Sequence, residues 1–410
     1  MKPHPLPPAA QPPRRQARPD PLATLQQAAQ ARQADGLGRH LHARAPGAGG
    51  IVDLASNDYL GLSGDERLAE AAAAAARRWG TGSTGSRLVT GTTELHTQLE
   101  DELAAFSGAA AALVFSSGYL ANLGVIPALA QALGTGRAGT GVLIVSDAAN
   151  HASLIDACRL ARARVVVTPH ADPCAVEQAL ARRTEPAAIV VSDTVFSVTG
   201  DQAPVAELHR AARAHQALLV LDEAHAFGVL GPGGRGVAAA AGIAGDPHVV
   251  RTLTLSKSLA GQGGAVTGAA GIIGTLIDVG RAFIFDTGLA PPSVAAARTA
   301  LAIIRDEPGL GRRAQANAQR LAAMAAELGF QVPPPAAAVV RITIGEPGAA
   351  LEAQRICARS GVRAGCFRPP SVPAGQACLR LTARANLTEV DLASAFRALG
   401  AVRDHVRITA

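Results

Sequence analysis

Lysine is nearly absent from this chain of 410 residues, in which only Lys2 and Lys257 occur. Arginine stays protonated and cannot form an imine, whereas a lysine amine can lose its proton and attack a carbonyl carbon. An arginine-favouring codon composition explains the scarcity as well, and a surface lysine is the simplest interpretation of Lys257 taken alone. The residues that accompany Lys257 in the sequence therefore have to decide whether it takes part in chemistry.

Several residues that could together bind a substituted pyridine ring follow one another along the chain. A histidine can stack on a pyridine ring or reach its phenolate oxygen, an aspartate can pair with the protonated ring nitrogen, and a lysine can bind the ring's aldehyde. Hydroxyl groups beside that lysine suit phosphate oxygens. The series comprises Gly118-Tyr119, His151, Asp193, Asp222-x-x-His225 and Thr254-x-x-Lys257. Its order and composition predict a site for pyridoxal phosphate.

Asp222 follows directly on the apolar run 217–221. A buried carboxylate is costly without a cationic partner, and a protonated ring nitrogen would be such a partner. Residues 222–225 (Asp-Glu-Ala-His) also match the acidic box of helicases. That box requires a phosphate-binding loop with a lysine upstream, and neither lysine of this chain stands in one. The sequence therefore excludes a nucleoside triphosphatase of this type.

Gly80, Gly82 and Gly85 match the GxGxxG pattern of dinucleotide-binding proteins. In those proteins a strand precedes the glycines, whereas the alanine-rich residues 66–79 predict a helix. We therefore expect a tight loop that approaches a ligand or a partner subunit, and not a nucleotide site.

Short apolar runs rich in β-branched residues alternate with helical segments through the middle of the chain. This pattern predicts an α/β fold with a largely parallel sheet that helices cover on both faces. The chemistry-bearing residues follow most of these runs, and the carboxyl ends of parallel strands are where such sheets bind ligands. The predicted strands are 112–115, 142–145, 164–167, 188–191, 218–221 and 249–255.

The length and the change of pattern along the chain predict several parts. These are a disordered tail rich in proline and arginine (1–20), an N-terminal helix and strand (21–56), a large cofactor-binding domain (57–292) and a small α+β domain (293–410). A long helix over 293–329 should lead into the small domain, and residues 263–279 should form a buried strand and loop. The remaining predicted elements are helices 21–42, 94–106, 348–360 and 388–400, and strands 51–54, 339–344 and 378–382.

The composition favours small-molecule ligands over macromolecular ones. Half of the net charge of +6 lies in residues 1–20, and aromatic residues make up only 3% of the chain, too few for a surface that stacks nucleic-acid bases. The five cysteines show no ligand spacing, which indicates reduced thiols and no metal site in a cytoplasmic protein. No apolar run of spanning length and no signal core occur, so no membrane partner is expected. Nucleic-acid binding through the tail remains an alternative, and it predicts salt-sensitive binding.

Five segments resemble the α-oxoamine synthase family, whose members have fold type I of the pyridoxal-phosphate enzymes. They are 57–62 (Asn-Asp-Tyr-Leu-Gly-Leu), 150–154 (Asn-His-Ala-Ser-Leu), 195–201, 222–228 and 368–375. The resemblance spans about residues 25 to 405. Arg368-Pro369-Pro370 is most similar to the branch that condenses L-alanine with a pimeloyl thioester in biotin biosynthesis. The resemblance thus implies a decarboxylative acyltransferase that carries pyridoxal phosphate and acts as a homodimer.

The resemblance also implies a role for each matched residue. Lys257 would bind the cofactor aldehyde, Asp222 the ring nitrogen and His225 the phenolic oxygen, while His151 would stack on the ring. The other cofactor contacts that it implies are the backbone amides of Gly118 and Tyr119, together with Asp193, Ser197, Thr254 and, from the other subunit, Thr287. The substrate contacts that it implies are Asn57, His151, Arg368, Ser371 and Arg380.

Two positions depart from the family pattern. Asp193 stands where some relatives have glutamate, which implies a shorter or water-mediated contact. Gly38-Arg39 stands where relatives carry an arginine pair that meets the substrate, so either Arg39 takes over that contact or it is lost. The alternatives to alanine and a pimeloyl group are glycine with a short acyl-CoA and serine with a long-chain acyl group. A non-catalytic scaffold with the same fold is the alternative from another functional class.

Overall fold

The computed structural model describes residues 20–41, 43–45, 50–134 and 140–406. The chain divides into two units, Met1–Ala48 and Gly49–Ala410. The described part of the first unit contains α1 (Pro21–Ala34), which begins after Asp20, whose carboxylate accepts a hydrogen bond from the Leu22 amide. The helix ends well before the predicted residue 42, because Gly36 adopts a positive φ of 66°. The predicted tail lies, apart from Asp20, outside the described residues.

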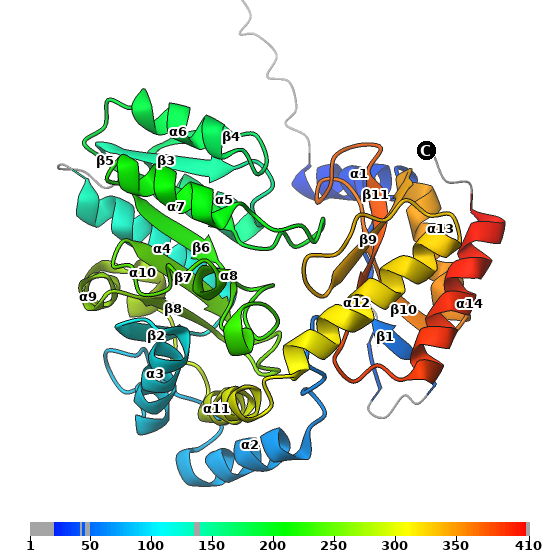
Figure 1. Cartoon of the computed structure of the whole chain (residues 1–410), viewed down its shortest axis with the longest axis horizontal. Helices are drawn as coiled ribbons and strands as arrows, with labels where there is room; N and C mark the ends of the chain where they lie inside the picture. The colour runs from blue at the N-terminus through cyan, green and yellow to red at the C-terminus, as the bar shows by residue number, and fades with distance from the viewer. Residues whose placement is uncertain (1–19, 42, 46–49, 135–139, 407–410) are drawn as a thin grey trace, which may run out of the picture. The chain divides into compact units, whose positions relative to one another are not determined.

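The second unit contains a seven-stranded sheet in the order β2-β8-β7-β6-β5-β3-β4 (Figure 1). All its strands run in one direction except β8, which is antiparallel to both of its neighbours. The predicted mostly parallel sheet is therefore confirmed. The strands are β2 (Ala111–Phe115), β3 (Val142–Asp147), β4 (Arg164–Thr168), β5 (Ala187–Asp193), β6 (Leu218–Asp222), β7 (Val249–Thr254) and β8 (Gly264–Gly268).

Alternate side chains of these strands enter two separate cores, one on each face of the sheet. In β3, Leu143 and Val145 pack in the larger core, whereas Val142 and Ile144 pack in the other. This period of two, with both faces apolar, is why the strands appear in the sequence as continuous apolar runs. The larger core involves α2 (Glu66–Trp79), α3 (Glu94–Ser107), α6 (Pro173–Ala181), α7 (Val205–Ala214), α8 (Val237–Ala240) and α11 (Pro291–Asp306). The other involves α4 (Gly118–Leu133), α5 (Ala152–Leu160), α9 (Ala270–Val279) and α10 (Arg281–Ile284).

A second sheet of four strands has the order β1-β10-β11-β9. Its strands are β1 (Val52–Leu54), β9 (Val339–Gly345), β10 (Val362–Phe367) and β11 (Ala377–Thr382). It shares an apolar core with α12 (Leu310–Glu327), α13 (Pro347–Arg359) and α14 (Glu389–His405), which Figure 1 shows beside it. The short 3-10 helix η1 (Pro232–Gly234) completes the described elements. Among these residues no helix is long and apolar enough to cross a membrane.

Three further elements differ from the sequence-based expectation. The single helix predicted over 293–329 is two helices, α11 and α12, because Glu307 before Pro308 leaves the helical conformation. Residues 270–279, part of the region 263–279 predicted as buried strand and loop, form the helix α9. Two glycines weaken this helix, but Ile273 and Leu276 bury their side chains in the core shared with α4. The strand β10 was not predicted, and it is held by hydrogen bonds to β1 and β11 on its two sides.

The register of the parallel strands brings the predicted site residues together. Asp193 at the end of β5 lies opposite Asp222 at the end of β6, and Asp222 lies opposite Thr252 of β7. Because parallel strands end at the same edge of a sheet, the loops that carry His151, His225 and Lys257 begin at this edge.

Candidate active site

Lys257 and His225 are in direct contact at the carboxyl edge of the larger sheet. The Lys257 Nζ atom lies 2.8 Å from His225 Nε2, and the other ring nitrogen, Nδ1, lies 2.5 Å from the hydroxyl oxygen of Tyr59. Although Lys257 keeps partial exposure to solvent, burial of its amine lowers the pKa to about 8. This value includes the charge of Asp222, which raises the pKa, the charge of Arg380, which lowers it, and the charge of Asp193, which raises it. A neutral amine, the form that attacks a carbonyl, is therefore accessible near neutral pH.

Asp222 is buried and held in place by two hydrogen bonds. Asn122 Nδ2 donates to its Oδ2 atom at 2.7 Å, and the amide of Ala224 donates to its Oδ1 atom at 2.9 Å. The same Asn122 Nδ2 lies 2.8 Å from Ser153 Oγ, which in turn lies 2.7 Å from His151 Nδ1. A network of hydrogen bonds thus joins the carboxylate predicted to pair with the ring nitrogen to the imidazole predicted to stack on the ring.

The Asp193 carboxylate holds the backbone of His151 in place. Its Oδ2 atom accepts a hydrogen bond from the His151 amide at 2.7 Å, and its own amide donates to Asn150 Oδ1 at 2.9 Å. Burial and the neighbouring charge of Asp222 raise the pKa of Asp193 well above its usual value. Partial desolvation lowers the pKa of His151, and burial together with Lys257 lowers the pKa of His225 well below its ordinary value. Both imidazoles are therefore neutral at physiological pH.

A cradle for an anion adjoins these residues at the start of α4, a helix of 16 residues whose N-terminal amides favour negative charge. A β-carbon added to Gly118 would lie 3.1 Å from Thr254 Oγ1, so the hydroxyl stands over the helix start. Thr254 Oγ1 is also 2.8 Å from Ser256 Oγ. Two hydroxyl groups and a helix N-terminus beside Lys257 fit the phosphate group of pyridoxal phosphate.

Replacing Gly264 with alanine should disrupt this cradle. The new β-carbon would lie 2.5 Å from the backbone of Gly118, so the start of α4 would have to move. We expect cofactor affinity to fall by about tenfold or more, while the sheet that contains Gly264 persists. Equilibrium dialysis against the cofactor, with circular dichroism as a check on folding, measures both. The matched control is Gly271→Ala, because a β-carbon there meets nothing within 4 Å, and equal affinity in the two variants would contradict the assignment.

Arg380 reaches the site from β11 of the smaller sheet. Its Nη1 atom donates to the carbonyl oxygen of Ser197 at 2.8 Å, and its Nη2 atom donates to Asn57 Oδ1. Its Nε atom is buried without a hydrogen-bond partner among the described residues. A buried guanidinium with an unused donor fits a carboxylate ligand.

Three predicted residues make their described contacts outside these networks and outside the cradle. Thr287 is exposed and forms a β-bridge with Ser86. Arg368 and Ser371 belong to the loop after β10, where the Ser371 amide donates to the Arg368 carbonyl. The predicted contact of Tyr119 is its backbone amide, which lies in the first turn of α4 at the cradle, whereas the residue as a whole is 43% exposed and its hydroxyl donates to Asp156.

Two sets of contacts make up the site: one joins Lys257, His225 and Tyr59, and the other joins Asp222 to His151 through Asn122 and Ser153. The sequence analysis did not predict three of these residues, namely Tyr59, Asn122 and Ser153. Asn122 had a signal that could have identified it, because it is the first amide side chain inside an otherwise apolar helix. Tyr59 and Ser153 lie within segments that were recognised but received no role. Glu223, next to Asp222, turns away from the site and accepts hydrogen bonds from the amides of Val237 and Ala238.

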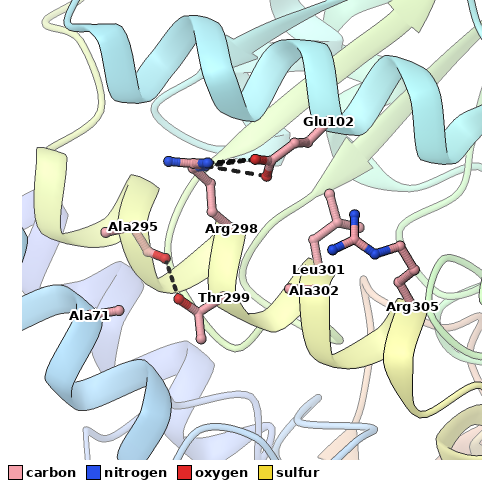
Figure 2. A pocket seen from close by; sticks show the side chains of 8 residues that line it. All are labelled: Ala71, Glu102, Ala295, Arg298, Thr299, Leu301, Ala302 and Arg305. Atoms are coloured by element: carbon pink, nitrogen blue, oxygen red, sulfur yellow. Dashed lines mark hydrogen bonds and ion pairs between the residues drawn. The ribbon is translucent and has the colours of Figure 1, made fainter.

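The glycine-rich loop and a surface hollow lie outside these networks. The loop follows helix α2, not a strand, which agrees with the exclusion of a dinucleotide site, and Ser83 at its centre donates to the Leu289 carbonyl. A hollow of about 420 Å³ lies between α2, α3 and α11 (Figure 2). There Arg298 is ion-paired with Glu102, and the Thr299 hydroxyl donates to the Ala295 carbonyl. None of the predicted site residues lines it.

Residues 50–399 match the family of class I and II aminotransferases. The 8-amino-7-oxononanoate synthase of Mycobacterium sp. (strain JLS) is 55% identical over 382 residues, which cover 93% of this chain and 97% of the relative. A serine palmitoyltransferase from S. paucimobilis with a bound PLP–myriocin aldimine aligns with a TM-score of 0.85 and 29% identity, covering 94% of this chain and 98% of that one.

The crystal structure of 8-amino-7-oxononanoate synthase from Francisella tularensis aligns with a TM-score of 0.70 and 25% identity, covering 85% of this chain and 97% of that one. These similarities confirm the resemblance and the fold type predicted from the sequence. The chain therefore belongs to the family of class I and II aminotransferases, as an enzyme of fold type I and a relative of the 8-amino-7-oxononanoate synthases.

Proposed function

We propose that this protein is a pyridoxal-phosphate-dependent acyltransferase that condenses L-alanine with a pimeloyl thioester. The products are 8-amino-7-oxononanoate, CO2 and the free carrier, which is coenzyme A or acyl-carrier protein. The observation that carries the proposal is the contact between Lys257 and His225 beside the buried Asp222, in a chain 55% identical to a protein of that name. The 55% identity over 93% of this chain to an enzyme of that name favours alanine as the amino acid.

Each residue of the site would bind a different part of the cofactor or of the substrate. Lys257 would hold the cofactor covalently through its aldehyde carbon, Asp222 would hold the ring nitrogen, and the cradle of Gly118, Thr254 and Ser256 would hold the phosphate. Bound in this way, the cofactor supplies an electron sink that stabilises negative charge at the alanine α-carbon. Arg380 and Asn57 would bind the alanine carboxylate, with Arg368 and Ser371 on the side of the acyl group.

Lys257 would act as the general base once alanine has displaced it from the aldehyde, taking the proton from the α-carbon onto Nζ. A carbon–carbon bond then forms to the thioester carbonyl, and the carbon–sulfur bond breaks with release of the carrier thiolate, which takes a proton from solvent. Loss of the carboxylate as CO2 leaves negative charge at the α-carbon, and a proton returned from Lys257 completes the product. The neutral His151 would cover the reacting atoms on one face of the ring.

The proposal extends to the assembly and the organisation of the chain. A homodimer with the site at its interface would allow Thr287 of the second copy to complete the phosphate site. The larger sheet and its helices would form the cofactor-binding domain over 57–292, and the remainder from 293 the small domain. The predicted location of the enzyme is the cytoplasm.

A matrix of substrates tests the proposed function. Alanine, glycine and serine are each combined with pimeloyl-, acetyl- and palmitoyl-CoA, and products are identified by mass spectrometry with CO2 release as a second measurement. We expect turnover only with alanine and the pimeloyl thioester, and a comparison of the CoA and acyl-carrier-protein thioesters identifies the carrier. Faster turnover with glycine or serine would reject the proposal in favour of another condensation of the family. Purified protein without bound cofactor and without activity would favour a scaffold.

A further inference from the structure

A continuous chain of side-chain contacts connects Arg380 to Lys257 through a tyrosine without an assigned role. Arg380 Nη2 donates to Asn57 Oδ1, and the Tyr59 hydroxyl oxygen lies 3.4 Å from the same oxygen. That hydroxyl oxygen lies 2.5 Å from His225 Nδ1, and His225 Nε2 lies 2.8 Å from Lys257 Nζ. The residues come from segments as far as 323 positions apart in the sequence, so only the folded chain assembles them.

The donors and acceptors at the Arg380 end of this chain are determined by chemistry. Arginine only donates, so the Asn57 atom that it contacts must be the amide oxygen. Tyr59 is fully buried, and burial raises the pKa of its hydroxyl, so it keeps its single proton. That proton can go to His225 Nδ1 or to Asn57 Oδ1. The nitrogen is nearer by 0.9 Å, and the oxygen already accepts from Arg380.

The direction of the hydrogen bonds depends on the proton of Lys257. When Tyr59 donates to Nδ1, His225 carries its proton on Nε2 and donates to a neutral Lys257 amine. A protonated Lys257 must instead donate to Nε2, which moves the imidazole proton to Nδ1 and turns the Tyr59 proton towards Asn57. In the second arrangement the 2.5 Å contact persists with reversed direction, so that Nδ1–H donates to the Tyr59 oxygen, and a phenol is a poorer acceptor than donor. The Tyr59 proton is then left with the long contact of 3.4 Å, which is a weak hydrogen bond. The geometry around Tyr59 is therefore more favourable when Lys257 is neutral.

We infer that Tyr59 is a positioning residue, which acts through His225 to keep the nitrogen of Lys257 unprotonated. The inference rests on the proposed function and deepens it, because the neutral amine is the form that attacks the cofactor aldehyde. The charged or titratable groups that act on His225 are Lys257, Arg380 and His151, and those that act on Lys257 are Asp222, Arg380 and Asp193. Tyr59→Phe leaves all of these in place.

The scarcity of lysine makes the test direct. In the full chain freed of cofactor and labelled with ¹³C at lysine Cε, NMR detects only Lys2 and Lys257. In Tyr59→Phe the ring packing against His225 and the backbone contacts of residue 59 persist. We expect the pKa of Lys257 to rise from about 8 to about 9, a tenfold gain in proton affinity. The visible band of the loaded enzyme should change its pH dependence as well.

Ser258→Ala is the matched control, because it also removes one buried hydroxyl beside Lys257, and that hydroxyl donates to the Phe227 carbonyl, away from His225. An unchanged pKa of Lys257 in Tyr59→Phe, or an equal rise in Ser258→Ala, would overturn the inference. A second measurement needs no Tyr59 variant. ¹⁵N spectra of the wild-type chain above pH 9, with His225→Gln to assign the signal, should show the proton of His225 on Nε2. A proton on Nδ1 there would also overturn it. Both outcomes are independent of which amino acid and acyl group the enzyme joins.

Discussion

Substitution of Lys257 by alanine is expected to abolish turnover, with a loss of at least about 10⁴-fold. The variant loses both the covalent attachment of the cofactor and the base that removes the α-proton, and no other lysine occurs among the residues that the structure describes. The absorbance band of the lysine–cofactor imine should disappear with the activity. The amine is already partly desolvated and lies close to a neutral imidazole, so its removal should cost little stability.

The only other lysine provides the control for this experiment. Lys2→Ala should retain the band and the full activity, since Lys2 lies in the N-terminal tail. Mass spectrometry after borohydride reduction should place the cofactor on Lys257 alone in the wild-type enzyme. An undiminished cofactor band in Lys257→Ala would show that the lysine assignment is wrong.

Replacing Asp222 with asparagine should leave the cofactor bound but slow removal of the α-proton by about 10²- to 10⁴-fold. The carboxylate charge keeps the ring nitrogen protonated, and a neutral amide of the same shape cannot do so. Since Asp222 also raises the pKa of Lys257, the variant should lower that pKa below about 8. Exchange of the alanine α-hydrogen for deuterium, followed by NMR without any acyl donor, isolates this step.

Asp278→Asn is a suitable comparison, because it removes a carboxylate from the exposed end of α9. Its exchange rate should equal that of the wild type. If Asp222→Asn exchanged the α-hydrogen at the wild-type rate, the proposed pairing with the ring nitrogen would have to be abandoned.

The buried contacts of Asp222 explain why its position is so well defined. Asn122 donates to it from α4, and the strand register places it opposite Asp193 and Thr252. Asn122 also leaves its own Oδ1 atom buried without a partner among the described residues, so its orientation is set by the two acceptors of its amide nitrogen. Neutral donors thus hold the Asp222 carboxylate in place, and the protonated ring nitrogen of the cofactor would supply the positive charge that pairs with it.

The sequence by itself determined the elements of the larger sheet and the order of the residues at its edge. Both follow from local rules: continuous apolar runs form buried parallel strands, and the loops after such strands meet at one edge. Lys257, His225, Asp222, Asp193 and His151 could therefore be placed at a common edge before any coordinates were known. The prediction of one long helix over 293–329 was wrong for an equally local reason. A proline disfavours the helical conformation of the residue before it, and this effect of Pro308 on Glu307 was overlooked.

Only the tertiary structure decided which side chains touch. Three contacts join residues that are far apart in the sequence. The separations are 166 positions for Tyr59 and His225, 100 for Asn122 and Asp222, and 323 for Arg380 and Asn57. Such contacts depend on the packing of separate elements and on the pairing of β11 with its neighbours, neither of which has a local signature in the sequence. The scarcity of lysine pointed to Lys257, but the folded chain shows what surrounds its amine: a neutral imidazole held by a buried tyrosine.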